Sequence, residues 1–225
     1  WTTVSLPSEP PPTIHEVVKL KISQEAALER EAFDASMDIT PLIDNLDNIQ
    51  AELIIKDEDG NNCNNLFQYT IRSLEGIESI DGTDTITTDE KGGIDWIIVP
   101  TDTAGSTDSA GKIYQVGAKL YFAVNGQSLG YETEYVPITV KPQPSLIIDY
   151  FIPSEVDAHA PFKIGVQVYN EGPGIAHNFR IKSAQPEIIE NLSGLLIDFA
   201  IHGSGVGSVY SPNDMEPNFG DIMPG

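Results

Sequence analysis

Residues 166–181 (VQVYNEGPGIAHNFRI) alternate apolar and polar side chains on both sides of a break that is rich in Gly and Pro. Val166 and Val168 precede the break, and Phe179 and Ile181 follow it. A period of two places successive side chains on opposite faces of a β-strand, and Asn, Gly and Pro are typical turn residues. The pattern therefore predicts two strands joined by a turn.

The same alternation recurs along the chain and predicts an all-β fold, because strands at this spacing without helical patterns between them are typical of a β-sandwich. It covers residues 16–23, 33–39, 49–55, 67–71, 93–99, 113–124 and 131–140, and then residues 146–151, 162–169, 177–183, 195–202 and 218–222. The pair Asn125-Gly126 is a strong hairpin signal. Trp96 lies in an apolar run, and we expect it in the core. Residues 23–32 (SQEAALEREA) are rich in helix formers, so they are predicted as one short helix or as a loop between strands.

Two proline-rich segments divide the chain. Residues 1–13 are read as an extended linker. Pro142 and Pro144 end strand pairing and predict a domain boundary with a short, stiff, rod-like connection. We therefore predict two tandem immunoglobulin-like β-sandwiches, at residues 14–141 and 145–225. A Pro-Gly turn ends the second one where a further strand is expected, so its last strand is predicted to be missing.

The charge balance is strongly acidic. Thirty-four Asp and Glu residues against 12 Lys and Arg give a net charge of -22. A polyanion repels nucleic acid and anionic membrane surfaces, so neither is an expected partner. The apolar runs are far shorter than the ~20 residues of a membrane-spanning helix, so no membrane insertion is expected. The surplus of carboxylates either keeps the protein soluble or collects Ca²⁺, which prefers oxygen ligands.

The second half resembles the bacterial and archaeal CARDB and NEW3 immunoglobulin-like domains. Their pattern is a strand, an N-x-G motif, a small residue and Ala, another strand and a late Pro-Gly turn. The matching positions here are Asn170, Gly172, Gly174, Ala176, Phe179, Pro224 and Gly225. The whole chain also resembles paired blocks of very large secreted surface proteins, in stretches such as YQVGAKLYFAVNG and SAQPEIIENLSGLLIDF. The resemblance implies a secreted, modular, non-catalytic role, and it carries no catalytic residues.

Two groups of oxygen ligands are candidates for Ca²⁺, the one cofactor that the sequence suggests. Asp57, Asp59 and Asn61 have the first spacings of a calcium loop, but the Gly and the bidentate acid of an EF-hand are not in their places. A turn between strands explains the same residues, and we favour it. The second group, for an ion near the domain boundary, consists of Asp149, Glu155 and Asp157. Solvated loop acids are the simpler interpretation of that group.

Four tyrosines lie on adjacent strands of the expected hairpin: Tyr114, Tyr121, Tyr131 and Tyr135. A row of exposed rings would stack on sugars, whereas cross-strand packing would use the same rings to stabilise the sheet, and we favour packing. Asn191 begins the one N-x-S/T sequon of the chain and is a candidate for glycosylation.

No catalytic constellation accompanies these candidates. The four histidines do not have the spacing of zinc ligands, and Cys63 is the one cysteine of the chain. We therefore predict a non-enzymatic, extracellular or cell-surface protein that serves as a stiff spacer and assembly module of a large surface or filament-forming protein. Its expected partners are neighbouring modules of the same protein, other copies of it, or a protein or glycan ligand. The alternatives are a Ca²⁺-dependent or carbohydrate-binding adhesion module and an accessory domain of a secreted enzyme.

Overall fold

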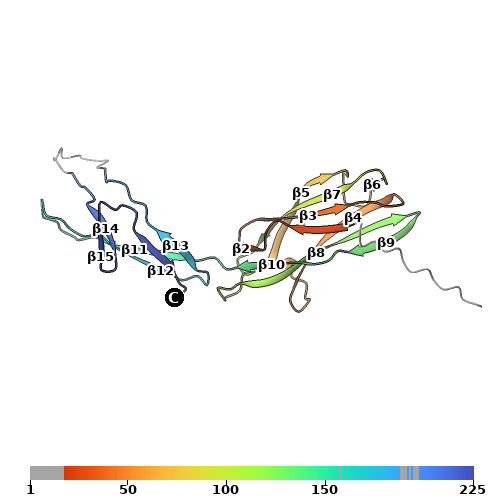
Figure 1. Cartoon of the computed structure of the whole chain (residues 1–225). Coiled ribbons are helices and arrows are strands. Elements are labelled where there is room, and N and C mark those ends of the chain that lie inside the picture. Colours follow the sequence, from red (N-terminus) through yellow and green to blue (C-terminus); the bar gives the residue numbers. More distant parts are fainter. Residues whose placement is uncertain (1–17, 158, 188–191, 193, 195–197) are drawn as a thin grey trace, which may run out of the picture. The chain divides into compact units, whose positions relative to one another are not determined.

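The computed structural model describes residues 18–157, 159–187, 192, 194 and 198–225 (Figure 1). These residues form strands and turns, with the 3₁₀ turn Asn64–Leu66 as the one helical element among them. The all-β prediction is confirmed. Of the described residues, 18–106 and 110–141 form one compact unit, and the others form a second. No described helix is long and apolar enough to cross a membrane.

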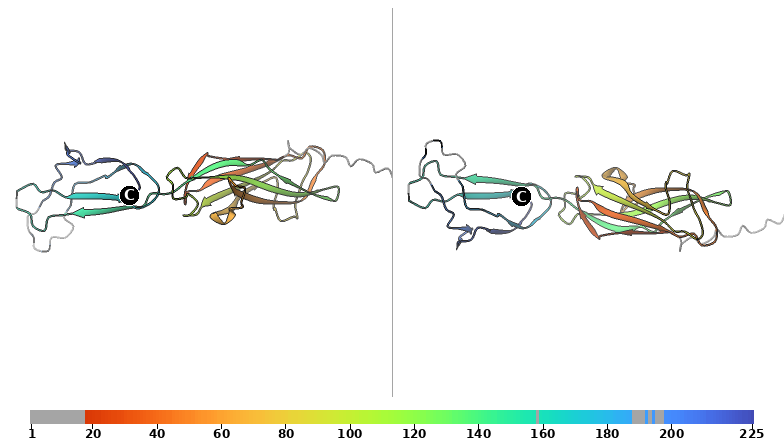
Figure 2. Two further views of the ribbon diagram at one scale, coloured as in Figure 1. Left: turned by 90° about the horizontal axis from the view of Figure 1, so that it is seen from below. Right: turned by 90° about the horizontal axis from the view of Figure 1, so that it is seen from above.

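The first unit is a sandwich of two sheets (Figure 2). One sheet is antiparallel, with the strand order β1 (Val18–Ile22), β3 (Phe33–Ile39), β7 (Gly92–Pro100) and β5 (Phe67–Glu75). The other has the strand order β2 (Ala26–Leu28), β10 (Val136–Lys141), β8 (Lys112–Val124), β4 (Leu46–Asp57) and β6 (Thr85–Ile86), with β9 (Gln127–Glu132) also paired to β8.

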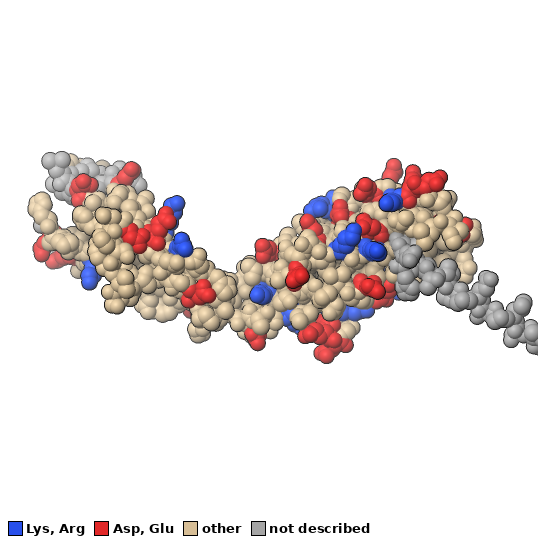
Figure 3. Space-filling view, viewed as in Figure 1, with Lys and Arg blue, Asp and Glu red and all other residues tan. Residues whose placement is uncertain are grey.

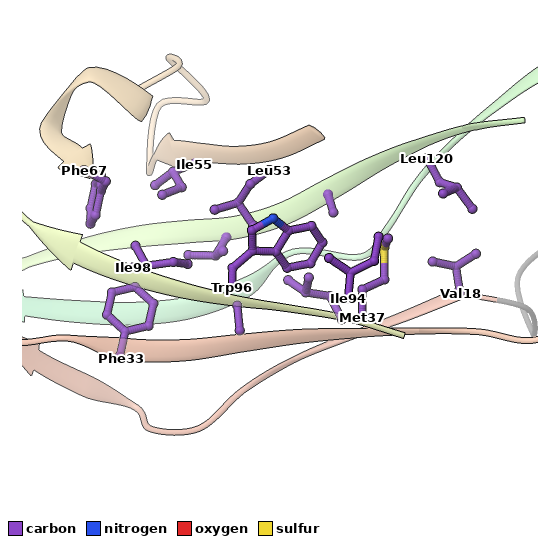
Figure 4. Close-up of a cluster of buried hydrophobic side chains, with 14 of the residues drawn as sticks. Val18, Phe33, Met37, Leu53, Ile55, Phe67, Ile94, Trp96, Ile98 and Leu120 are labelled. Atoms are coloured by element: carbon purple, nitrogen blue, oxygen red, sulfur yellow. The ribbon is translucent and has the colours of Figure 1, made fainter. Parts of the chain in front are cut away.

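Alternation along the strands places one side of each sheet in the core. Every second residue of β7 is buried, including Ile94, Trp96 and Ile98. Leu53 of β4 and Leu120 of β8 belong to the same buried cluster from the other sheet (Figure 4). Trp96 is 2% exposed, so its predicted place in the core is confirmed.

The helix alternative for residues 23–32 is wrong. The segment contains strand β2, which pairs in parallel with β10. The N–H of Glu29 donates to the carbonyl of Lys141 (3.0 Å), and the N–H of Arg30 donates to the carbonyl of Pro100 (2.8 Å). These bonds to both sheets replace the local bonds of a helix, so tertiary pairing overrides the helix propensity of the segment.

Strand β8 carries two partners in succession along one of its edges. Residues 112–116 pair with β10, and residues 119–124 pair with β9. Between them, Thr133 closes the gap, because its N–H donates to the carbonyl of Ala118 (2.9 Å) and its hydroxyl accepts from the N–H of Ala118 (3.0 Å). Asn125 and Gly126 join β8 to β9 with φ angles of 51° and 78°, so the predicted hairpin turn is confirmed.

The second unit consists of three two-stranded ladders in its described residues. Strand β11 (Leu146–Phe151) pairs with β12 (Gly165–Asn170), β13 (Ala176–Arg180) with β16 (Asn218–Ile222), and β14 (Gly203–Val206) with β15 (Val209–Pro212). The two strands predicted within residues 166–181 are therefore present as β12 and β13, and each pairs with a different partner. Residues 198–202, from the predicted strand at 195–202, are not in a strand, and residues 195–197 lie outside the described part.

Candidate functional site

The calcium candidates Asp57 and Asn61 close the turn that follows β4. Oδ1 of Asp57 accepts hydrogen bonds from the backbone N–H groups of Asp59 (3.1 Å) and Asn61 (2.8 Å), and Oδ2 accepts one from Nδ2 of Asn61 (3.2 Å). Hydrogen bonds from Asn61 lower the pKa of Asp57 below its usual value. The bond from the Asn61 side chain has the largest effect, and the bond from its backbone N–H has the next largest. Gly60, at a φ of 84°, supplies the left-handed position of the turn. The structure thus brings these candidates together as donors and acceptors of a hydrogen-bonded turn.

The second calcium group does not converge in this structure. Asp149 lies on β11, Glu155 and Asp157 lie in the segment after it, and all three side chains are exposed. Within the described residues, no three or more His, Cys, Asp and Glu side chains are grouped to hold a metal ion. The glycosylation candidate Asn191 lies outside the described residues.

The four tyrosines lie on different faces of their sheet and form no exposed row. Tyr114 is fully buried, with its ring edge-on to Phe67 at a centroid distance of 4.9 Å and its hydroxyl donating to the carbonyl of Ala104 (2.8 Å). Burial raises the pKa of Tyr114 to about 12. Tyr131 also packs against the core. These two rings match the packing interpretation.

Tyr135 and Tyr121 lie on the outer face of the sheet, each beside a glycine. The Tyr135 ring covers Gly117, where an added Cβ would come within 2.8 Å of the ring, and Lys56 Nζ lies 4.2 Å from the ring centroid. Tyr121 faces Gly130 across β8 and β9 and is 38% exposed. Aromatic rings that cover cross-strand glycines stabilise sheets, so these two positions also match the packing interpretation.

Asn170 explains why the N-x-G motif is present in the second unit. Its side chain is buried and makes four hydrogen bonds. Oδ1 accepts from the N–H groups of Ser145 (3.0 Å) and Gly172 (3.1 Å). Nδ2 donates to the carbonyls of Gly174 (2.6 Å) and Ile222 (3.1 Å). One side chain therefore ties the turn after β12 to the start of β11 and to the end of β16.

The motif glycines are required by close backbone contacts. A Cβ at Gly172 would lie 2.4 Å from the backbone N of Ser145, and a Cβ at Gly174 would lie 2.2 Å from the carbonyl oxygen of Pro142. Real Cβ atoms do not approach other atoms so closely, so only Gly fits at both positions. The function of the motif in this chain is structural.

The second unit leaves most of its apolar side chains exposed. Among its described residues, Ala176 is the one buried hydrophobic side chain. On β11, Ile147 and Ile148 are 39% and 38% exposed, and Tyr150 and Phe151 are 62% and 56% exposed. Exposed apolar side chains in such number are typical of surfaces that bind another polypeptide. We call the paired strands β11 and β12 the apolar ribbon.

A second apolar surface lies at the open edge of the first unit, along β5. Among the described strands, β5 pairs only with β7. A groove of about 310 Å³ runs between β5 and the opposite sheet, and we call it the β5 groove. Its walls include Tyr69 and Ile71 of β5, Ala51, Glu52 and Leu53 of β4, and Ile80.

Nothing in the sequence identified the β5 groove. The stretch FQYTI alternates like every other strand of the first unit, and its apolar residues read as core. The signal is topological, because a strand at the end of a sheet has a neighbour on one side only.

No family model and no curated protein sequence matches the chain. In structure it is similar to a family 123 glycoside hydrolase from Clostridium perfringens, at 10% sequence identity and a TM-score of 0.35, over 56% of this chain and 28% of that one. It is also similar to a cohesin module from a Clostridium perfringens family 33 glycoside hydrolase, at 11% identity and a TM-score of 0.32, over 56% of this chain and 98% of that one. A third similar structure is Spo0M, a sporulation control protein from Bacillus subtilis, at 14% identity and a TM-score of 0.32, over 56% of this chain and 49% of that one.

These similarities are low, and no function is transferred from them. The chain spans little more than a quarter of the family 123 hydrolase. The chain is all-β, as the CARDB and NEW3 resemblance implied for its second half, and membership of those families stays a prediction.

Proposed function

We propose that the chain is a non-catalytic structural and adhesive segment of a large extracellular surface or filament-forming protein. In this role the first unit serves as a stiff spacer, and the second unit serves as an assembly module that associates with neighbouring modules or other copies of the protein. The proposal needs no cofactor.

The exposed apolar ribbon is the observation that carries the proposal. The first unit buries apolar side chains from both its sheets in one core, whereas the ribbon exposes Ile147, Tyr150 and Phe151 to solvent. Burying apolar surface is worth about 25 cal/mol per Å², so the second unit gains stability when another polypeptide covers these side chains. An assembly module uses this gain to hold its partner.

The charge on the ribbon is compatible with association between copies. The chain as a whole carries a net charge of -22, and acidic side chains are spread over the first unit (Figure 3). Along β11 and β12, by contrast, Asp149 is the one charged residue. Two ribbons can therefore meet with little like-charge repulsion. The outer edges of β11 and β12, which pair with no other described strand, offer backbone groups for pairing.

Sedimentation of the full chain over a wide range of concentrations tests the proposal. We expect concentration-dependent association that Ile147→Lys abolishes. The matched control is Ile43→Lys, because Ile43 is 84% exposed in the first unit and its replacement should leave association unchanged. A wild-type chain that stays monomeric throughout, or association that Ile147→Lys leaves intact, would refute the assembly role.

A further inference from the structure

The tip of the β8–β9 hairpin carries the one Asn-Gly pair of the chain. Asn125 and Gly126 are exposed, and they join Val124 and Gln127, which close the ladder between the two strands. Both residues of the pair have a positive φ, which Asn and Gly adopt more readily than other residues. The turn therefore accounts for the backbone of this pair, but not for the Asn125 side chain.

The Asn125 amide has no hydrogen-bond partner among the described residues. Other asparagines of the chain are held in place. Asn170 makes four side-chain hydrogen bonds, and the Asn64 side chain bonds to the backbone of Ile55 (2.8 Å) and Leu53 (2.7 Å). A side chain without such bonds moves among its staggered rotamers. The Cγ atom of Asn125 is therefore free to approach the backbone nitrogen of the next residue.

Gly126 leaves that approach open. A Cβ added at this position would have no heavy atom within 4 Å, and Gly brings no side chain of its own. Three other asparagines have a positive φ, and each precedes a residue with a side chain: Asn48, Asn178 and Asn213. Asn125 is thus the asparagine that combines an unbonded, exposed amide with an unobstructed neighbouring nitrogen.

We propose that Asn125 is a site of non-enzymatic deamidation, with water as the one co-reactant. The backbone nitrogen of Gly126 attacks Cγ of Asn125 and loses its proton to solvent. The tetrahedral carbon then expels the side-chain nitrogen, which takes up a proton and leaves as ammonia. A five-membered succinimide ring remains, in which the Gly126 nitrogen is bonded to both carbonyl carbons of residue 125.

Water opens the ring at either carbonyl carbon. Attack at Cγ breaks the bond from Cγ to the Gly126 nitrogen and gives aspartate. Attack at the main-chain carbonyl carbon breaks the original peptide bond and gives isoaspartate, in which the main chain runs through Cγ. In both cases the ring nitrogen regains a proton from water. Both products carry a carboxylate, so each adds one negative charge that Asn125 lacks.

The pH dependence separates this reaction from that of the two Asp-Gly pairs, Asp59-Gly60 and Asp81-Gly82. A carboxyl must be neutral to lose water on ring closure, and ordinary Asp carboxyls are ionised above about pH 4. Hydrogen bonds, the largest effect being from the Thr83 side chain, lower the pKa of Asp81 further. The Asn125 reaction begins with loss of a backbone amide proton, so it should accelerate in alkaline solution while the Asp-Gly pairs stay ionised.

Either product should weaken the β8–β9 hairpin. Asn125 lines a polar hollow of about 280 Å³ together with Asp44 and Asp47, so the new carboxylate lies near two others in a chain with a net charge of -22. Isoaspartate also adds a backbone atom to a turn whose length sets the register of its strands. Strand β9 has β8 as its one partner among the described strands, so its amides should exchange faster after conversion.

Peptide mapping by mass spectrometry tests the proposal on the full chain after incubation at neutral and at mildly alkaline pH. We expect Asn125 to be deamidated about tenfold faster than any other asparagine, and faster still at alkaline pH. Labelling with a protein isoaspartate methyltransferase identifies isoaspartate among the products. Hydrogen exchange of the converted protein should be faster in β9, with β7 as internal reference.

Matched variants show whether the Gly126 nitrogen is the nucleophile. Gly126→Ala should slow the reaction about tenfold, because the added methyl group crowds the path to Cγ. Gly60→Ala is the matched control, because Gly60 also has a positive φ and open space at its Cβ position, and it should leave the Asn125 rate unchanged. Asn125→Gln keeps Gly126 and should abolish the reaction at this position, because the longer side chain would have to close a six-membered ring.

The decisive comparison is between the folded chain and the chain unfolded in urea. If only the unfolded chain reacts at Asn125, the hairpin protects this residue and the proposal is wrong. It is also wrong if other asparagines react as fast, or if Gly126→Ala reacts at the wild-type rate. Unchanged exchange in β9 after conversion would contradict the expected weakening of the hairpin.

Discussion

Asn170 is expected to be the most sensitive single position in the second unit. In Asn170→Ala, four side-chain hydrogen bonds are lost from a residue that is 3% exposed. At a net value of about 1 kcal/mol for each bond, the variant should lose about 4 kcal/mol of stability. Small domains are stable by roughly 5–15 kcal/mol, so this loss removes a large share of the total.

Asn170→Asp probes the same site with a side chain of nearly the same shape. It keeps both bonds in which Oδ1 accepts, but it replaces Nδ2 by an oxygen that faces the carbonyls of Gly174 and Ile222, now 2.6 and 3.1 Å from Nδ2. A buried carboxylate without a cationic partner costs several kcal/mol. We therefore expect Asn170→Asp to be less stable than Asn170→Ala at neutral pH.

Acid should reverse part of that difference. Burial raises the pKa of the introduced carboxyl above its unfolded value, so the stabilising effect of its neutral form is complete below about pH 4 and is lost as the pH rises through the folded-state pKa. The neutral carboxyl also donates one hydrogen bond, which restores one of the two lost contacts. The stability of Asn170→Asp relative to Asn170→Ala should therefore rise as the pH falls.

Hydrogen exchange of the full chain measures these effects in each unit separately. A loss of about 4 kcal/mol corresponds to amide exchange about a thousandfold faster in β11, β12 and β16, with β7 of the first unit as internal reference. Gln167→Ala is the control, because Gln167 is an exposed polar residue of β12 and should change stability by no more than about 0.5 kcal/mol. If Asn170→Ala matches Gln167→Ala, or if Asn170→Asp is the more stable variant at neutral pH, the reasoning is refuted.

Three further predictions concern the first unit. Gly117→Ala should lower the free energy of unfolding in urea by about 1–3 kcal/mol, because the added Cβ would come within 2.8 Å of the Tyr135 ring. Gly130→Ala should be tolerated, because its nearest contact would be at 3.5 Å. Equal losses of stability in the two variants would contradict this prediction. Burial raises the pKa of Tyr114 from 10.0 to about 12, so the stability that its neutral hydroxyl contributes is complete below about pH 10 and declines towards pH 12. Ultraviolet titration of the wild type and of Tyr114→Phe should differ by one phenol that ionises at a higher pH than an ordinary tyrosine. Asp57→Asn should lower the melting temperature near neutral pH, and this difference from wild type should shrink in acid because hydrogen bonds lower the pKa of Asp57; a difference that is constant with pH would argue against the turn.

Strand positions in the first unit follow from alternation, because period-two hydrophobicity and pleated geometry match residue by residue. The alternation in β3 and β7 predicted both the strands and their buried faces. Alternation did not predict the structure of residues 23–32. Their helix propensity is a local property, whereas the backbone of Glu29 and Arg30 bonds to strands that are distant in the sequence. Propensity is a weak predictor wherever tertiary hydrogen bonds compete with it.

The tyrosine candidates carried a signal that sequence reasoning overlooked. Tyr114 and Tyr121 lie on one continuous strand, β8, seven positions apart, which is an odd interval. In a regular strand, such residues point to opposite faces, so one ring had to be buried if the other was exposed. The structure shows this division, with Tyr114 buried and Tyr121 exposed.

Alternation predicts which side of a strand seeks burial, but only the neighbouring layer decides whether burial is achieved. Strands β7 and β11 both carry apolar residues at successive positions, yet Ile98 is fully buried and Ile148 is 38% exposed. The difference is that β7 lies between two strands and under a second sheet, whereas β11 has one partner, β12. Tyr69 on β5 is the intermediate case, because it has a sheet beside it and no strand beyond it. Exposed apolar surfaces are therefore expected where alternation places apolar residues on a strand face that no neighbouring layer covers. This mismatch is the physical basis for assigning a binding role to the apolar ribbon.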